Sequence, residues 1–222
     1  MININTFRGV AGWFLASTVT CLALPLTVAD AAEPSASLPP AALESFRPQD
    51  EAWAARLVPD QTQATCIRTR NLPEGEEAAA LLKRATDSVR FPADGQLMGD
   101  WKRGEALAQN GRGLQHSDAP DTRNGGNCYA CHQMAPEEIG YGTLGPTLLG
   151  YGRLRGQSEF IQRYTWTKIY NAQAYVPCSI MPRFGTQGIL GEQDIADLVA
   201  LLLDPESPVN AEPAGDAGAP GR

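Results

Sequence analysis

The sequence predicts an all-α fold in which a helical C-terminal domain follows a partly helical extension. Three segments carry helical patterns, at residues 75–89, 98–109 and 191–204. Stretches rich in glycine and proline separate these segments and predict the loops between them. The length of 222 residues suits one modest domain with an extension.

The N-terminal segment at residues 1–31 has the pattern of a secretory signal peptide. An apolar run spans residues 10–28, and the small side chains of Ala29 and Ala31 stand where a signal peptidase recognises its substrate, so cleavage is expected after Ala31. The run is long enough for an uncleaved membrane anchor as an alternative. Cys21 could suggest lipoprotein processing, although the Thr-Val-Thr before it fits that pattern poorly. No second apolar run follows, so we expect a periplasmic protein without a membrane span after signal removal.

An extension is expected at residues 32–94. Ala, Pro and Ser dominate its start at residues 32–42, which predicts a flexible lead-in. The helix expected at residues 75–89 has apolar residues at helical spacing, namely Ala78, Leu81, Leu82 and Ala85. Because the extension carries no recognisable chemistry, we expect it to pack onto the following domain and to meet a partner chain.

The main domain is expected at residues 95–205. Its first helix, at residues 98–109, ends at glycines, and its last helix starts after Gly191 and ends before Pro205. Acidic residues in the first turn of this last helix match the positive end of the helix dipole. Pro, Gly and Ala dominate residues 206–222, which predicts a disordered tail.

The pentapeptide Cys128-Tyr129-Ala130-Cys131-His132 is the most informative feature of the chain. Two thiols at this spacing can bond the two vinyl groups of one porphyrin, and the adjacent imidazole then ligates the iron as the proximal ligand. The motif therefore predicts one covalent haem c. A structural zinc site would need further ligands, usually from a second Cys pair, and a thioredoxin-like redox pair normally opens a helix after a buried strand. Both remain as alternatives.

Two further cysteines, Cys66 and Cys178, are left once the motif and the signal are set aside. An even number of cysteines in an exported chain predicts a disulfide between them. The alternative is a free thiol near the haem, because Cys178 lies three residues before Met181.

Met181 is the expected sixth ligand of the iron. It stands 49 residues after His132, between prolines that stiffen its loop, and this is enough chain to reach the distal face. Met134 follows His132 too closely to cross the ring, Met98 suits the core, and His116 remains as an alternative ligand. Ligation by His and Met raises the reduction potential, so the chain is expected to accept electrons.

Charge and aromatic residues are unevenly distributed. The chain has 18 Lys and Arg against 25 Asp and Glu, which argues against a nucleic-acid partner. Between residues 139 and 191, however, there are five basic residues and only one acidic residue, and half of all aromatic residues occur there. We expect a haem wall, with arginines near the propionates; the alternative is an ordinary core with a basic face. The basic residues are Arg153, Arg155, Arg163, Lys168 and Arg183, and the aromatic ones are Tyr141, Tyr151, Phe160, Tyr164, Trp166, Tyr170, Tyr175 and Phe184.

Several motifs together resemble the SoxX family, the monohaem c-type cytochromes of bacterial sulfur oxidation. The likeness runs from about residue 90 to residue 204 and is most specific around Met181. The motifs are Gly-Asn-Cys-Tyr-Ala-Cys-His at 126–132, Leu-Gly-Pro-Thr-Leu at 144–148, Gly-Tyr-Gly at 150–152, Pro-Cys-Ser-Ile-Met-Pro-Arg-Phe-Gly at 177–185 and Gln-Asp-Ile-Ala-Asp-Leu-Val at 193–199, with a further match at 93–102.

This resemblance implies a class I cytochrome c fold with its terminal helices packed on each other. It implies His132 as the proximal ligand, Met181 as the distal ligand, and the carbonyl of Pro146 as acceptor for the other ring N–H of His132. It also implies a heterodimer with a SoxA-like cytochrome subunit, which joins thiosulfate to a cysteine of a SoxYZ-like carrier protein.

The expected role is electron relay to a downstream acceptor. Joining thiosulfate to a thiol removes two electrons, whereas one haem iron stores one, so bond formation is expected in the partner and no catalytic residue is assigned here. Two alternatives are a free diffusible cytochrome c shuttle, and a haem enzyme or sensor with an open distal site.

Overall fold

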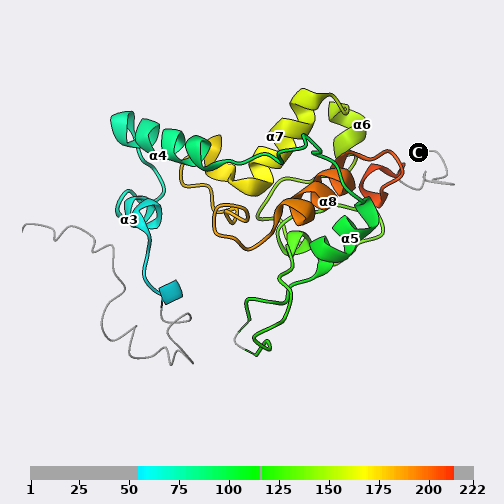
Figure 1. The fold of residues 1–222 in the computed structure, drawn as a ribbon, viewed down its shortest axis with the longest axis horizontal. Helices are drawn as coiled ribbons and strands as arrows, with labels where there is room; N and C mark the ends of the chain where they lie inside the picture. The colour runs from blue at the N-terminus through cyan, green and yellow to red at the C-terminus, as the bar shows by residue number, and fades with distance from the viewer. Residues whose placement is uncertain (1–54, 116, 213–222) are drawn as a thin grey trace, which may run out of the picture. The chain divides into compact units, whose positions relative to one another are not determined.

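A computed structural model describes residues 55–115 and 117–212 and confirms the all-α prediction, since these residues form helices and 3-10 turns without any strand (Figure 1). None of the described helices is long and apolar enough to cross a membrane. The expectations for the signal peptide, the lead-in and His116 lie outside the described residues. The elements are α3 Gln61–Arg68, α4 Gly75–Ser88, α5 Trp101–Gln109, η1 Cys128–Ala130, α6 Tyr151–Arg155, α7 Glu159–Tyr170, η2 Ala172–Ala174, α8 Glu192–Leu203 and η3 Pro208–Asn210.

Helices α5 and α8 lie side by side and form the centre of the core (Figure 1). A Cβ atom at Gly104 of α5 would lie 2.2 Å from the carbonyl oxygen of Asp197 in α8, so only glycine lets the two backbones approach this closely. Apolar side chains of both helices are buried around this contact, namely Leu107, Ala108, Ile195, Leu198, Val199, Leu201 and Leu202. Burial of these side chains supplies the main driving force for this pairing.

A buried carboxylate, that of Asp197, links α8 to the start of α5. Its side chain is 1% exposed, and its two oxygens accept hydrogen bonds from Nε and Nη2 of Arg103, both at 2.7 Å. The main-chain N–H of Asp100 donates to it at 2.8 Å, and Nε2 of Gln193 donates at 2.9 Å. Burial disfavours the charged form, but the hydrogen bonds from Arg103, Asp100 and Gln193 outweigh it and hold the pKa of Asp197 below its ordinary value.

The first helix of the main domain begins later than the sequence predicted. Residues 98–109 were expected to be helical, but α5 starts at Trp101 because the Asp100 carboxylate accepts from the main-chain N–H of Lys102 at 2.8 Å and so caps the helix. The preceding Gly99 instead donates its N–H to the carbonyl of Ala196 in α8, at 2.9 Å. The contact of Gly99 with α8 therefore prevents α5 from starting earlier in the chain. The last helix, α8, starts after Gly191 and ends before Pro205, as predicted.

The prediction that residues 206–222 are disordered is wrong for their first part. Ser207 and Val209 are buried, and Asn210 joins three parts of the chain through its side chain. Its amide donates to the carbonyls of Leu202 and Asp204 at the end of α8, at 3.1 and 2.7 Å, and its oxygen accepts from the N–H of Gly152 at 2.8 Å. These bonds satisfy helix-end groups of α8 and α6, which explains the ordered turn. Residues 213–222 lie outside the described part.

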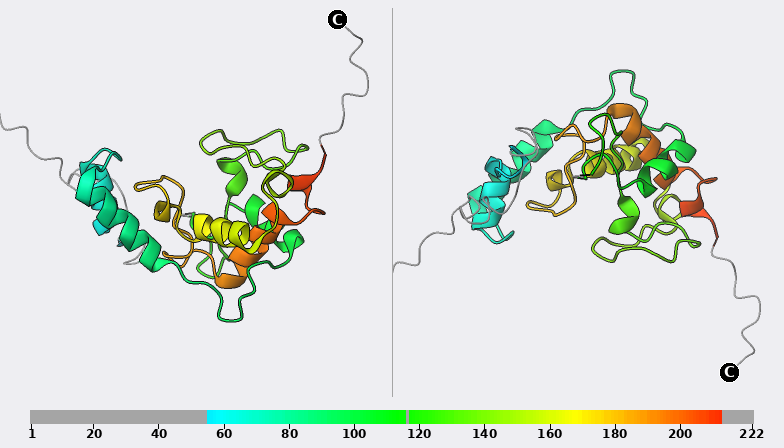
Figure 2. Two further views of the ribbon diagram at one scale, coloured as in Figure 1. Left: turned by 90° about the horizontal axis from the view of Figure 1, so that it is seen from above. Right: turned by 90° about the horizontal axis from the view of Figure 1, so that it is seen from below.

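The extension packs on the main domain, as expected, and α4 matches the predicted helix to within one residue. Figure 2 shows α4 beside the segment that carries η2, in agreement with their contacts. The predicted disulfide between Cys66 and Cys178 is confirmed, with 112 residues between the two cysteines. Nε1 of the buried Trp166 donates to the carbonyl of Arg90 at 2.8 Å. The extension is thus fastened to the domain at several points.

We predict that Asp197→Asn lowers the free energy of unfolding by about 2 kcal/mol at pH 7, because neutral Asn accepts more weakly from a half-exposed Arg103. Since the folded-state pKa of Asp197 lies below its ordinary value of 3.8, its contribution is complete well above pH 3.8 and is lost as the pH falls through the folded-state pKa. The free energies of unfolding of wild type and variant, measured with urea from pH 7 to pH 3, should therefore converge as the pH falls. Asp87→Asn, which breaks only an exposed pair with Lys83, is the control and should change stability little. A difference in unfolding free energy between wild type and Asp197→Asn that stays constant from pH 7 to pH 3 would contradict the prediction.

Candidate functional site

The pentapeptide lies on the 3-10 turn η1 and the residues just after it. The turn begins after Asn127, whose φ of 46° is left-handed, and the N–H groups of Cys131 and His132 both bond the carbonyl of Cys128, at 3.0 and 2.9 Å. This tight turn brings both thiols and the imidazole to one cavity, which all three residues line. The turn follows a loop, which differs from the strand-then-helix context of a thioredoxin-like pair.

The ring of His132 is held in one orientation by the loop that follows. Its Nδ1 lies 2.7 Å from the carbonyl oxygen of Pro146, and since a carbonyl only accepts, Nδ1 must carry the proton. This is the hydrogen bond that the resemblance implied. It leaves Nε2 unprotonated in the neutral ring, with a lone pair free to ligate a metal.

Glycines make this arrangement possible. A Cβ at Gly145 would lie 2.2 Å from Cε1 of His132, and one at Gly142 would lie 1.8 Å from the carbonyl oxygen of Ala130. Three main-chain bonds hold the loop to the motif, from the N–H of Gly142 to Tyr129, of Gly145 to Cys131 and of Leu148 to Gln133, at 2.9, 2.8 and 2.7 Å. The sequence analysis included Gly145 in the Leu-Gly-Pro-Thr-Leu motif but gave it no role, and it did not single out Gly142.

A cavity of about 530 Å³ adjoins the motif, within the ~300–1,000 Å³ usual for cofactor and ligand sites. Cys128, Cys131, His132, Pro146 and Met181, the five residues predicted from the sequence, all line it. Its other walls are mainly apolar and come from α6, α7, α8 and the loop that carries Met181, with Leu148, Leu149, Tyr151, Leu154, Tyr164, Ile169, Ile180, Phe184 and Leu202. The size, the apolar walls and the donor set fit a covalently held porphyrin.

Three observations bear on the alternatives of a redox pair and a zinc site. Burial, with a contribution from the neighbouring Cys131, raises the pKa of Cys128 to about 12, so its reactive thiolate form is disfavoured. Cys66 and Cys178 are consumed in their disulfide. Within residues 55–115 and 117–212, no group of three or more His, Cys, Asp or Glu side chains could hold a metal ion.

Of the candidates for a second axial ligand, Met181 lines the cavity. Met134 is 1% exposed and belongs to the core, as expected from its closeness to His132, and Met98 packs at the edge of the same core. Neither of these lines the cavity. Met181 is the methionine that the structure brings to the motif.

The expected aromatic wall is only partly correct. Tyr151, Tyr164 and Phe184 line the cavity, whereas Trp166 is buried in the core and Phe160 projects into solvent. The spacing of aromatic residues along the chain cannot separate these cases, because α7 carries side chains on both its cavity face and its outer face.

Two cations of the basic segment border the cavity, Arg155 and Lys168. The Arg155 guanidinium lies 5.0 Å from the ring centre of Tyr151, and partial burial lowers the pKa of Lys168. The other basic residues are engaged elsewhere: Arg163 with Glu159, Arg153 with Glu212 and Arg183 with Asp60. An anionic edge of a bound group would therefore meet Arg155 and Lys168.

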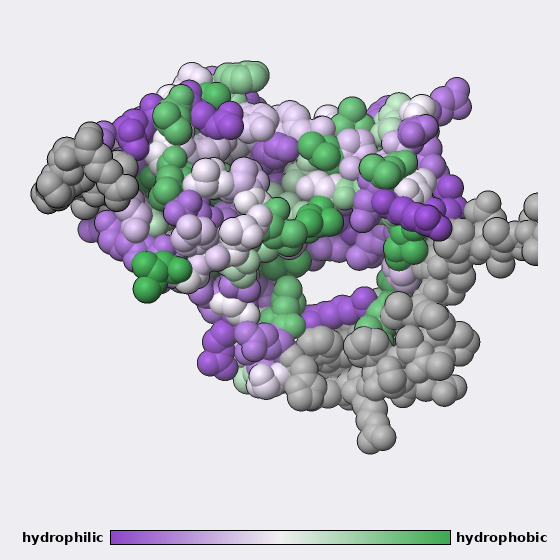
Figure 3. Space-filling view, turned by 180° about the vertical axis from the view of Figure 1, so that it is seen from behind, coloured by the Kyte–Doolittle hydropathy of each residue, from purple (hydrophilic) through white to green (hydrophobic). Residues whose placement is uncertain are grey.

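Apolar side chains also reach the surface at the cavity. Leu144, Leu154 and Ile180 line it and are exposed over more than half of their surface. On the face drawn in Figure 3, exposed apolar side chains occur in several separate groups among polar ones. An apolar rim of this kind shields a cavity from water while leaving its edge accessible.

A comparison with known proteins finds a relative of this chain. A protein of Aquifex aeolicus (strain VF5), named "Uncharacterized lipoprotein", is 39% identical over 171 residues, which cover 75% of this chain and 77% of that protein. No family model matches the chain. At this identity and coverage, the chain belongs to the same family as the Aquifex aeolicus protein.

We predict that Gly145→Ala displaces the His132 ring and lowers the free energy of unfolding by about 1–3 kcal/mol, because the new Cβ overlaps the imidazole. The measurements are urea unfolding and ¹⁵N NMR of the His132 Nδ1–H, which should lose its hydrogen bond to Pro146. Gly140→Ala is the matched control, since its Cβ would meet only the end of the Glu138 side chain, at 3.4 Å. An unchanged Nδ1–H signal in Gly145→Ala would show that the loop does not fix this ring.

Proposed function

We propose that this member of the Aquifex aeolicus lipoprotein family is a monohaem c-type cytochrome with a class I cytochrome c fold, which transfers electrons. The observation that carries the proposal is that Cys128, Cys131, His132 and Met181, placed up to 53 residues apart in the chain, all line one largely apolar cavity. The packing of α5 against α8 supports the fold assignment, because the resemblance implies terminal helices in contact.

Each residue has a definite task in this proposal. Cys128 and Cys131 would hold haem c through thioether bonds, and Nε2 of His132 and the sulfur of Met181 would be its axial ligands. When bound, haem c supplies a one-electron Fe(III)/Fe(II) couple. The Pro146 carbonyl keeps the proton on Nδ1 of His132 and thereby strengthens Nε2 as a donor. Arg155 and Lys168 would neutralise the propionates.

We further propose that the chain is a SoxX-like electron-transfer subunit rather than the seat of the reaction. Among residues 55–115 and 117–212 no carboxylate lines the cavity, so these walls offer no acid or base of that kind for bond formation. A one-electron site suits a relay, whereas joining thiosulfate to a carrier cysteine releases two electrons. A SoxA-like cytochrome subunit would be the stable partner, a SoxYZ-like protein the carrier, and a further redox protein the electron acceptor. The apolar rim at Leu144, Leu154 and Ile180 supports contact with such partners.

We also propose export to the periplasm. The pattern of residues 1–31 supports it, and the relative's name, lipoprotein, describes a class of exported proteins. That name makes lipid attachment at Cys21 the alternative to cleavage after Ala31. The mass of the mature protein separates the two, because lipidation retains Cys21 and adds acyl chains.

The function is tested first by haem attachment. In a host competent in cytochrome c maturation, we expect the denatured full-length chain to retain one haem on a haem-stained gel. Cys128→Ser/Cys131→Ser should abolish this staining, since no thioether bond can form, while the control Cys66→Ser/Cys178→Ser should keep it. A wild-type chain that folds without retained pigment would sink the proposal.

The subunit role is tested by affinity purification from the native host, followed by haem staining of the associated chains. We expect a second haem protein to copurify in stable, equimolar amounts, because a relay subunit must remain beside the site it serves. A chain that purifies alone as a haem-bearing monomer would instead support the shuttle. Rapid carbon monoxide binding without a far-red ferric band would support a haem enzyme or sensor with an open distal site.

A further inference from the structure

We infer that the N-terminal extension is a positioning element for Met181, acting through a disulfide and an ion pair that lie on either side of it in the chain. This inference rests on the proposed role of Met181 as an iron ligand. It assigns to residues 55–94 a task beyond packing, namely to hold the sulfur at the cavity. The links come from two residues of the extension, Cys66 and Asp60, which reach Cys178 and Arg183.

The covalent link precedes the ligand by three residues. Cys66 of α3 is bonded to Cys178, and both lie in a small buried cluster with Leu81 of α4, so the bond is packed on both of the extension's described helices. Cys178 has a φ of 58°, in the left-handed region that an ordinary L residue rarely adopts. Such a conformation persists only where the surroundings impose it. The disulfide is the strongest constraint on this residue.

The ionic link follows the ligand by two residues. Nη2 of Arg183 donates to Oδ2 of Asp60 at 2.5 Å, and Arg183 is only 8% exposed. Asp60 is itself fixed, because its other oxygen caps α3 by accepting from the N–H of Gln63 at 2.8 Å. In the described part of the chain, Arg183 has no other carboxylate partner. A buried guanidinium without this partner would draw the loop toward solvent.

Main-chain bonds of the loop hold residues on either side of Met181, since the N–H of Ser179 donates to the Val176 carbonyl at 3.0 Å and the N–H of Gln187 to the Arg183 carbonyl at 2.9 Å, but the bonds next to the sulfur are weak. The N–H of Met181 reaches only the Ser179 hydroxyl, at 3.4 Å, and Nε2 of Gln173 reaches the Ser179 carbonyl at 3.3 Å. Pro182 has no N–H to donate. The links to the extension therefore restrain the position of the sulfur from both sides, in addition to the bonds of the loop itself.

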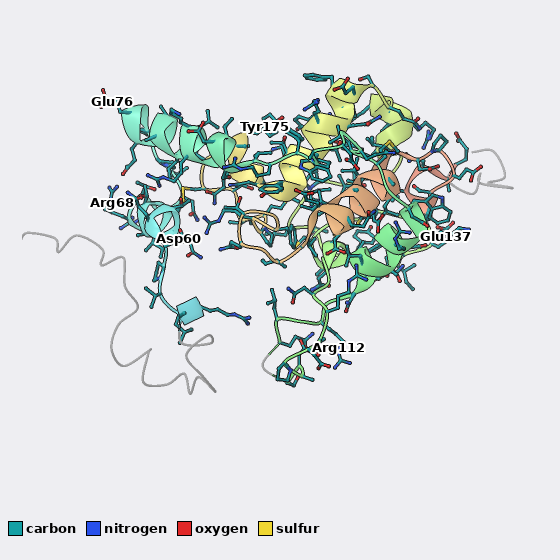
Figure 4. All side chains as sticks on the ribbon, viewed as in Figure 1. Asp60, Arg68, Glu76, Arg112, Glu137 and Tyr175 are labelled. Carbon is teal, nitrogen blue, oxygen red and sulfur yellow. A yellow bond between two sulfur atoms is a disulfide. The ribbon has the colours of Figure 1, made fainter. Side chains whose placement is uncertain are left out.

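The extension offers a matched control. Arg68 of α3 pairs with Glu77 of α4, a second ion pair of α3 that stays within the extension. Figure 4 labels Asp60 just before the start of α3 and Arg68 at its end. Glu77→Gln therefore removes one ion pair of the same helix without touching the loop of Met181.

The experiment uses the full haem-loaded chain with the changes Asp60→Asn, Cys66→Ser/Cys178→Ser and Glu77→Gln, and Met181→Ala as the reference for complete loss of the ligand. The readouts are the far-red band of sulfur-ligated ferric haem, the midpoint potential and the rate of carbon monoxide binding. We expect Asp60→Asn and the double serine variant to weaken the band and to lower the potential toward that of Met181→Ala. Each should speed carbon monoxide binding about tenfold, because the sulfur leaves the iron more often. Glu77→Gln should match wild type.

The outcomes that would overturn this inference differ from those that would overturn the proposed function. A wild-type chain that has the far-red band, with Asp60→Asn and the double serine variant less stable but unchanged in band, potential and carbon monoxide rate, would overturn the inference alone. A wild type without the band, or Met181→Ala with an unchanged band, would overturn both. If the double serine variant does not accumulate, Asp60→Asn decides, because its disulfide is intact. Asp60→Glu should then restore part of the band by restoring the charge.

Discussion

The hydrogen bond from Nδ1 of His132 to the carbonyl of Pro146 is the interaction on which the site depends. It fixes the tautomer of the ring, so that Nε2 of the neutral ring keeps its lone pair, and His132 lines the cavity. It can form only because Gly145 leaves room for the imidazole against the main chain. The chemistry of the motif is thus set by a loop that contributes no reactive side chain.

The two sides of the cavity are held in different ways. On the His132 side, main-chain bonds join residues 129–133 to residues 142–148, so the support is local in sequence. On the Met181 side, restraints also come from Cys66 and Asp60, more than 100 residues away. The main-chain bonds on the His132 side can form together with the turn, because their partners are close in sequence. The links from Cys66 and Asp60 require the extension to dock first. The His132 side can therefore be complete before the Met181 side is fixed.

This difference explains what could be predicted from the sequence. The pairing of Cys66 with Cys178 by count and helix α8 by its apolar period depend on arithmetic or on local pattern, and the structure agrees with both. The Cys-x-x-Cys-His motif is also a local pattern, and its two thiols and imidazole line one cavity. The pair of Asp60 with Arg183 and the bridging side chain of Asn210 were not predicted, because no local pattern marks which distant polar groups will meet. The late start of α5 at Trp101 has both origins, since the Asp100 cap is a local signal whereas the contact of Gly99 with α8 is not.

The distribution of charge around the cavity completes the physical picture. Arg155 and Lys168 place cations at the wall, and no carboxylate of the described residues lines it. Asp197, the buried carboxylate of α8, is already neutralised by Arg103. A cavity with this balance favours a ligand that is apolar in its body and anionic at one edge. It offers few ligands to a hard cation such as Mg²⁺ or Ca²⁺, which prefers carboxylate oxygens. The apolar rim near Ile180 is then the surface through which another protein could approach such a ligand.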